Sequence, residues 1–158
     1  MTEAPLRVLF ICTGNSARSQ MAEAILRHLS KGKIDVSSAG SHSRPEIHPM
    51  AREAVQKLFH LDMRGQHPKS FEPYLGRNFD YVISVCDRAA ESCPVFPGDP
   101  TRIRWSFEDP AEAEGTEDDR RRAFESTAMD LMRRIRIWMA LPSVSGRAGI
   151  ETLPRPTA

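Results

Sequence analysis

The segment from Arg7 to Cys12 constrains the fold of this chain most strongly. It reads Arg-Val-Leu-Phe-Ile-Cys, an almost unbroken apolar run of the kind that a strand buried on both faces of a parallel sheet requires. A glycine-bearing turn from Thr13 to Ser16 follows it, and apolar residues then recur at helical spacing as far as Ser30. The order strand, loop, helix predicts the first unit of an alternating α/β fold.

Strands and helices continue to alternate along the rest of the chain. The patterns predict, in order, a strand at 34–39, a helix at 48–59, strands at 81–85 and 103–105, and a long amphipathic helix through Phe124 and Trp138. This alternation predicts a three-layer αβα fold with a four-stranded parallel sheet and right-handed crossovers. Ligands of such folds bind at the carboxyl ends of the strands, where Cys12, Gly40 and Cys86 are expected to lie.

The composition is that of one soluble globular domain, since 40% of the 158 residues are hydrophobic and 27% are charged. We expect this domain to span residues 1–141. Residues 142–158 follow the last amphipathic helix, contain little to bury and are expected to form a disordered tail. Lys and Arg (22) nearly balance Asp and Glu (21), which argues against a general binder of nucleic acid or membrane surfaces.

The cysteine count is odd: the chain has three. Met1 to Pro5 show no basic region followed by an apolar run, and no apolar stretch approaches the length of a membrane span. We therefore expect a cytoplasmic protein, for which a monomer is the default, and a set of permanent disulfides is not expected. The thiols are then either incidental or chemically active, and their positions decide between the two.

The loop after the first strand combines a thiol with groups that attract an anion. Cys12 ends the strand, Gly14 lets the backbone come close to a ligand, and Arg18 can grip two oxygens at once. Loop amides and the helix dipole also favour an anion, so a tetrahedral oxyanion fits this loop. The same field is expected to lower the pKa of Cys12 and make it a nucleophile, with Ser19 donating a hydrogen bond to the sulfur or to the leaving group. The predicted oxyanion site comprises Thr13, Gly14, Asn15, Ser16, Ala17, Arg18 and Ser19.

A buried, inert Cys12 beside a surface arginine is the simpler interpretation, because cysteine is commonly buried. The segment from Val8 to Glu23, however, resembles the signature of the low-molecular-weight tyrosine phosphatase superfamily, and especially of its thioredoxin-coupled arsenate reductases. The resemblance runs from about Arg7 to Leu141 and implies the phosphatase-like fold. Both kinds of enzyme attack a tetrahedral oxyanion with a thiolate, so this loop does not separate reduction from hydrolysis.

Two further cysteines favour reduction. Cys86 ends the third apolar strand, and Cys93 follows after six intervening residues. This pair resembles the second and third redox cysteines of the arsenate reductases. The resemblance implies that Cys12 attacks arsenate, that Cys86 attacks the adducted Cys12 and releases arsenite, and that Cys93 then attacks Cys86. Reduced thioredoxin would reopen the resulting disulfide, and no bound cofactor is implied.

Other interpretations of Cys86 and Cys93 stay open. One thiol can pack in the sheet while the other lies idle on a loop. A zinc site is less favoured, because zinc sites usually show a closer cysteine pair and the five histidines are scattered. Glutaredoxin or a small thiol can also replace thioredoxin, although such routes ordinarily need fewer protein thiols.

Asp109 matches the family's general acid, which protonates the leaving oxygen. An Asp-Pro pair by itself is more often a turn, so this role depends on the resemblance. Phosphatases of this fold typically have an aromatic residue after the pair and a second cysteine before the arginine, whereas this chain has Ala111 and Ala17. The first difference favours a small inorganic oxyanion, and the second leaves Cys86 as the resolving thiol.

Several arsenate reductases of this family hold a potassium ion with residues that match Asn15, Glu23 and Ser38, together with an acidic residue. Lys69 falls near the acidic position in this chain. Its ammonium group is expected to neutralise Glu23 and fix Asn15, so that no structural potassium or other metal is bound. A solvated loop lysine is the competing interpretation.

Three functions therefore remain. The favoured one is an arsenate reductase recycled by thioredoxin and serving arsenic detoxification. The second is a low-molecular-weight protein tyrosine phosphatase that uses Cys12, Arg18 and Asp109. The third is an oxyanion-binding or redox-sensing module without catalysis.

Overall fold

The computed structural model describes residues 4–87 and 93–150. Four strands form one parallel sheet in the order β2-β1-β3-β4. The strands are β1 (Leu6–Cys12), β2 (Ile34–Gly40), β3 (Tyr81–Ser84) and β4 (Thr101–Arg104). The helices are α1 (Arg18–Leu29), α2 (Pro49–Phe59), α4 (Glu117–Met139) and α5 (Pro142–Ala148), and the 3-10 turns are η1 (Glu72–Tyr74) and η2 (Pro110–Glu112). The predicted α/β class and parallel sheet are confirmed.

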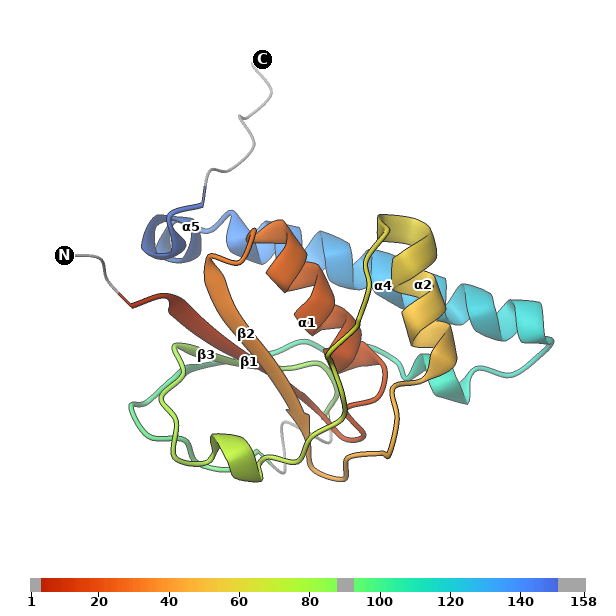
Figure 1. Ribbon diagram of the computed structural model, residues 1–158, viewed down its shortest axis with the longest axis horizontal. Coiled ribbons are helices and arrows are strands. Elements are labelled where there is room, and N and C mark those ends of the chain that lie inside the picture. The colour runs from red at the N-terminus through yellow and green to blue at the C-terminus, as the bar shows by residue number, and fades with distance from the viewer. Residues whose placement is uncertain (1–3, 88–92, 151–158) are drawn as a thin grey trace, which may run out of the picture.

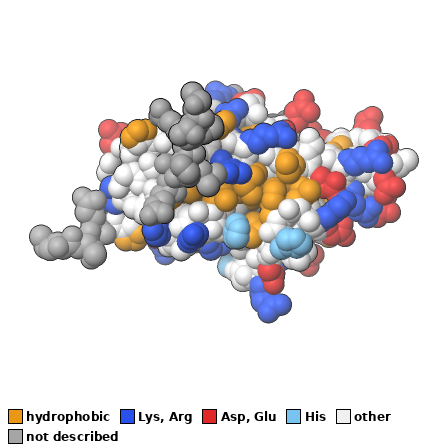
Figure 2. All heavy atoms as spheres, turned by 90° about the horizontal axis from the view of Figure 1, so that it is seen from above, with side chains coloured by type: hydrophobic (Ala, Val, Ile, Leu, Met, Phe, Trp, Pro, Cys, Tyr) orange, Lys and Arg blue, Asp and Glu red, His pale blue; other side chains and the backbone are white. Residues whose placement is uncertain are grey.

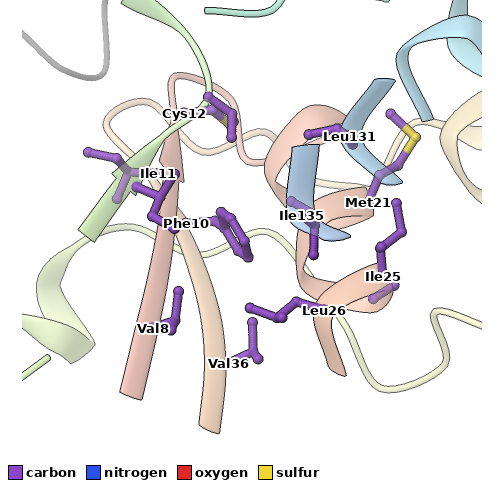
Figure 3. Close-up of a cluster of buried hydrophobic side chains, with 14 of the residues drawn as sticks. Val8, Phe10, Ile11, Cys12, Met21, Ile25, Leu26, Val36, Leu131 and Ile135 are labelled. Carbon is purple, nitrogen blue, oxygen red and sulfur yellow. The ribbon is translucent and has the colours of Figure 1, made fainter. Parts of the chain in front are cut away.

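The central position of β1 explains its unbroken apolar sequence. This strand pairs with β2 on one side and β3 on the other, and its residues from Val8 to Cys12 are buried. Both faces of a central parallel strand are covered, so both sets of alternating side chains must be apolar. Figure 3 shows Phe10 pointing toward Leu26 of α1 and Ile135 of α4, whereas Ile11 points to the other face.

Helices α1 and α4 lie over one face of the sheet, and α2 packs against both of them (Figure 1). The opposite side carries η1 and its neighbouring loops (Figure 1), where the rings of Tyr74, Phe79 and Phe96 pack in sequence with centroids 6.0 and 5.7 Å apart. The sheet is thereby covered on both faces. All four carboxyl ends of the strands point to one edge, and this shared edge positions the residues discussed below.

The surface over the helices mixes both signs of charge. Figure 2 shows acidic and basic side chains interspersed there, with hydrophobic side chains gathered between them. The mixed run at the start of α4 belongs to this surface, and a reciprocal pair of hydrogen bonds between Thr116 and Asp119 caps the helix. Among the helices of residues 4–87 and 93–150, none has the length and apolar character needed to cross a membrane.

The expectation of a disordered tail from residue 142 is wrong for its first part. Residues 142–148 form α5, which begins with Pro142 in the first helical turn, where proline fits well, and ends before Gly149 with its φ of 67°. Val144 is fully buried, and α5 contacts β1. One buried valine in a short helix produces no periodic pattern, so the sequence did not reveal it. Residues 151–158 lie outside the described residues.

Candidate active site

Five of the seven residues predicted for the oxyanion site line a cleft of about 700 Å³ at the carboxyl edge of the sheet, whereas Asn15 and Ser19 are fully buried and do not line it. Cys12, Arg18, Cys86 and Asp109 all line it. Thr13, Gly14, Ser16 and Ala17 form part of the same wall. The structure therefore brings residues that are far apart in the sequence to one site.

The segment between β2 and α2 holds the outer side of the loop. Four backbone hydrogen bonds join this segment to the loop. Each is donated by an N–H group of the segment to a carbonyl oxygen of the loop: Ser41 to Cys12 (3.2 Å), His42 to Thr13 (2.9 Å), Arg44 to Gly14 (2.9 Å) and His48 to Ser16 (2.9 Å). These carbonyls are used on the outer side of the loop, and the Asn15 N–H is directed at the Cys12 sulfur. A Cβ atom on Gly40 would lie 2.5 Å from the Thr13 carbonyl oxygen, so this close approach requires glycine.

Two hydrogen bonds reach the buried Cys12 sulfur. The backbone N–H of Asn15 donates to Cys12 Sγ at 3.0 Å, and Ser19 Oγ lies 2.7 Å from the same sulfur. Asn15 Nδ2 donates to Ser19 Oγ at 2.8 Å, so this oxygen accepts from Asn15 while its hydroxyl proton remains available to the Cys12 sulfur. Asn15 adopts a left-handed φ of 48°, a conformation that asparagine tolerates better than most residues.

The predicted lowering of the Cys12 pKa is not what this arrangement produces. Burial raises the pKa of the Cys12 thiol above its ordinary value, and Cys86 adds to the rise. The hydrogen bonds from Ser19 and Asn15 and the charge of Arg18 oppose that rise without overcoming it. The sequence pattern identified the groups that stabilise a thiolate, but it did not show how completely the sulfur is removed from water.

Arg18 is turned toward the far wall of the cleft. Its Nη1 donates to the carbonyl oxygen of Phe107 at 2.8 Å, and its Nη2 lies 3.7 Å from Asp109 Oδ2. Asp109 Oδ1 accepts a hydrogen bond from the Ala111 amide at 2.9 Å. The Asp-Pro pair is thus a turn, as its sequence alone suggests, and it also presents a carboxylate oxygen to the cleft.

Behind the loop, a buried carboxylate anchors Asn15. Asn15 Nδ2 donates to Ser38 Oγ at 3.0 Å, and Ser38 Oγ donates to Glu23 Oε1 at 2.7 Å. Two cations face Glu23: Arg27 Nη2 lies 2.7 Å from Oε2, and Lys69 Nζ lies 3.9 Å from Oε1. Burial lowers the pKa of Lys69, whereas the charge of Glu23 acts in the opposite direction.

The sequence interpretation identified Lys69 but missed Arg27 and two glutamines. Arg27 lies one helical turn after Glu23 on α1, and this spacing was the available signal. Gln20 Nε2 donates to Asn15 Oδ1 at 3.0 Å, and Gln66 Nε2 donates to Gln20 Oε1 at 2.8 Å. The Lys69 backbone N–H supplies a second bond to Asn15 Oδ1 at 2.8 Å. Neutral glutamines carry no motif, so their positions emerge only from the fold.

Three further cleft residues come from the segment after β2: His42, Arg44 and His48. Arg44 lies over Gly14, where an added Cβ would meet its Nε at 3.2 Å. His48 caps α2 by accepting a hydrogen bond from the Met50 N–H at Nδ1, and burial, followed by the charges of Arg120 and Arg44, lowers its pKa. These residues add positive or hydrogen-bonding groups that the first-loop motif does not contain.

The three cysteines are free thiols, and they lie at two separate sites. Cys86 is buried in the cleft with Cys12, and Thr13 Oγ1 lies 3.5 Å from its sulfur. Cys93 is half-buried and lines a separate hollow of about 100 Å³ with Ile11 and Val82. Residues 88–92, which connect Cys86 to Cys93, lie outside the described residues. Two of the predicted thiols therefore share the cleft, and the third lies against the sheet outside it.

Ser19→Ala tests the hydrogen bond to Cys12. We expect this change to raise the pKa of Cys12 further. At a pH below the titration midpoint of Cys12, the thiolate fraction is expected to fall about tenfold, which is the effect of losing one hydrogen bond to a charged group. The measurement is thiolate ultraviolet absorbance against pH in a Cys86→Ser, Cys93→Ser background. Ser16→Ala is the matched control, because the Ser16 hydroxyl donates to the Glu46 carbonyl instead. Identical titrations of Ser19→Ala and its parent would contradict the assignment.

Comparison with known proteins identifies the family of this chain. The sequence profile of the family described as low molecular weight phosphotyrosine protein phosphatase matches residues 7–140. The arsenate reductase of Shouchella clausii is 36% identical over 129 residues, which cover 82% of this chain and 91% of that protein.

Solved structures give the same result. An arsenate reductase in its oxidized state superposes with a TM-score of 0.71 at 28% identity, covering 85% of this chain and 96% of that one. The thioredoxin-dependent arsenate reductase of Corynebacterium glutamicum has a TM-score of 0.59 at 26% identity, covering 87% of this chain and 65% of that one. From the profile match across residues 7–140 we conclude that this chain belongs to the low molecular weight phosphotyrosine protein phosphatase family.

Proposed function

We propose that this protein reduces arsenate to arsenite with its own thiols. The observation that carries the proposal is the presence of Cys12 and Cys86 in one cleft. Hydrolysis of a phosphate ester needs one nucleophilic thiol. Reduction of arsenate needs a second thiol, which forms a disulfide with the first. The similarity to curated arsenate reductases supports the same substrate.

In the first step, the sulfur of Cys12 attacks arsenic. Arsenate enters against the amide side of the loop, and Arg18 exchanges its contact with Phe107 for two arsenate oxygens. Because burial opposes the thiolate, the thiol proton passes to an arsenate oxygen as the anion binds. A sulfur–arsenic bond forms and an oxygen leaves as water, with Asp109 as the proton donor to the leaving oxygen.

The second and third steps exchange thiols. Cys86 attacks the Cys12 sulfur, so a Cys12–Cys86 disulfide forms and the electron pair of the sulfur–arsenic bond stays on arsenic, which leaves as arsenite. Cys93 then attacks the Cys86 sulfur and releases Cys12. This last step requires Cys93 to move, because it lies outside the cleft that Cys12 and Cys86 line.

Reduced thioredoxin is the proposed electron donor, and it reopens the Cys86–Cys93 disulfide. The similarity to the thioredoxin-dependent enzyme of Corynebacterium glutamicum supports this partner. The three free thiols suit the cytoplasm, where cysteines are kept reduced, and we place the enzyme there as a monomer that serves arsenic detoxification. No bound cofactor takes part in the scheme.

A phosphatase that uses Cys12, Arg18 and Asp109 is the alternative, since these residues line the cleft together. Two positions disfavour it. Ala111 stands where an aromatic side chain would stack on a phosphotyrosine ring, and Cys86 would be idle in hydrolysis. Weak hydrolysis of aryl phosphates is compatible with either activity, because the oxyanion loop is common to both.

Substitution of each thiol separates the two activities. We expect Cys12→Ser, Cys86→Ser and Cys93→Ser each to lose multiple turnover, because each thiol takes part in one transfer. The measurement is NADPH oxidation with arsenate, thioredoxin and thioredoxin reductase. A Cys86→Ser variant that reduced arsenate at the rate of the parent would contradict the three-thiol relay. Efficient aryl-phosphate hydrolysis that needs only Cys12, Arg18 and Asp109 would favour the phosphatase.

Lys69 and Arg27 are proposed to supply the positive charge beside Glu23 that potassium supplies in some relatives. Both cations face the Glu23 carboxylate. The rate of arsenate reduction is therefore expected to be equal in potassium and sodium salts at constant ionic strength. Lys69→Met is expected to lower the rate, because the Glu23 charge then loses one of its partners, and the matched control is Lys57→Met, whose ammonium group pairs with Glu125 on the surface. Strong stimulation of the parent by potassium over sodium would defeat this assignment.

A further inference from the structure

The hollow around Cys93 contains a cation in direct contact with the thiol. Arg102 of β4 donates from Nη1 to Cys93 Sγ at 2.8 Å and from Nη2 to the Pro94 carbonyl oxygen at 3.1 Å. The planar guanidinium group thus holds the sulfur and the next carbonyl at the same time. The Cys93 sulfur also lies 3.5 Å from the Pro94 oxygen, and Arg102 satisfies that oxygen whether or not the thiol keeps its proton.

The residues that line the hollow leave Arg102 as the cation that acts on the Cys93 sulfur. Ile11, Val82 and Ile103 supply apolar wall to the hollow. Among the described residues that line it, the ionisable side chains are Cys93 itself, Arg102 and Arg104, and Arg104 Nε is paired with Asp87 Oδ1 at 3.2 Å. A guanidinium group beside a half-buried thiol stabilises the thiolate, which is the nucleophile in disulfide exchange.

The same strand holds both ends of the segment between the two resolving cysteines. Asp87, which follows Cys86, is bound by Arg104, and Cys93 is bound by Arg102. The two arginines are two residues apart on β4, so their side chains lie on one face of the sheet. Cys93 is therefore held beside β4 by Arg102, close in sequence to a second anchored residue.

We propose that Arg102 is the positioning residue that activates Cys93 for the final exchange by placing a cation on its sulfur; this rests on the proposed function. The Cys93 thiolate leaves the guanidinium group and attacks the Cys86 sulfur of the Cys12–Cys86 disulfide. The Cys86–Cys93 bond forms, the Cys12–Cys86 bond breaks, and the electron pair departs on Cys12, which then takes up a proton. No oxidant or reductant beyond the disulfide itself is needed.

The test isolates Cys93 in a Cys12→Ser, Cys86→Ser background and follows its alkylation by iodoacetamide against pH. Arg102→Met is expected to slow alkylation at neutral pH about tenfold and to move the rise in rate to higher pH, because the thiolate loses its cation. Arg102→Lys is expected to restore part of the rate. Arg133→Met is the matched control, since its partner is Asp130 on the surface of α4, and it is expected to leave the alkylation of Cys93 unchanged.

An Arg102→Met variant alkylated as fast as its parent, or faster, would overturn the proposal, because Arg102 would then only shield the sulfur. Failure of Arg102→Lys to improve on Arg102→Met would also overturn it. Arg102 is exposed, so these changes leave the core intact, and thermal unfolding of each variant checks this. The assay contains neither arsenate nor thioredoxin, so its outcome is independent of whether the protein reduces arsenate.

Discussion

The buried side chain of Asn15 is the constraint on which the rest of the site depends. Its amide nitrogen donates to Ser19 and Ser38, and its oxygen accepts from Gln20 and from the Lys69 backbone. All the hydrogen-bonding capacity of the amide is therefore used inside the protein. The loop is held in a left-handed turn by this one residue, and the turn brings the Asn15 backbone N–H onto the Cys12 sulfur.

The hydrogen-bond network extends from Cys12 to the buried Glu23 on α1. The Cys12 sulfur is joined through Ser19, Asn15 and Ser38 to the Glu23 carboxylate, which lies between two cations. A buried carboxylate requires such partners, since an unpaired charge in the interior is costly. The chain thus fixes the orientation of the loop with charges of its own.

The sequence predicted those parts of the site that have a local signature. The apolar run of β1, the glycine-bearing turn and Arg18 at the start of α1 belong to one continuous segment, so their pattern survives in the linear sequence. The parallel sheet then places Cys86 beside the same edge as Cys12, as expected. Lys69 Nζ lies 3.9 Å from Glu23 Oε1, and its predicted role in place of potassium stays a prediction.

Features set by burial or by distant packing could not be predicted in this way. The pKa of Cys12 depends on how much water the cleft admits, and that is a property of the assembled walls. Gln20 and Gln66 act through neutral amides with no spacing rule. Helix α5 buries Val144 without a periodic pattern in the sequence, and Arg102 of β4 meets Cys93 only in the folded chain.

The proposed chemistry requires that two thiols in one cleft be oxidised by one arsenate while the third waits outside it. The most direct measurement uses Cys93→Ser, one equivalent of arsenate and no thioredoxin, followed by arsenite determination and mass mapping of the peptides. The prediction is one arsenite released per protein together with a Cys12–Cys86 disulfide. Arsenite release without that disulfide, or Cys12 and Cys86 recovered as free thiols with no arsenite formed, would contradict it.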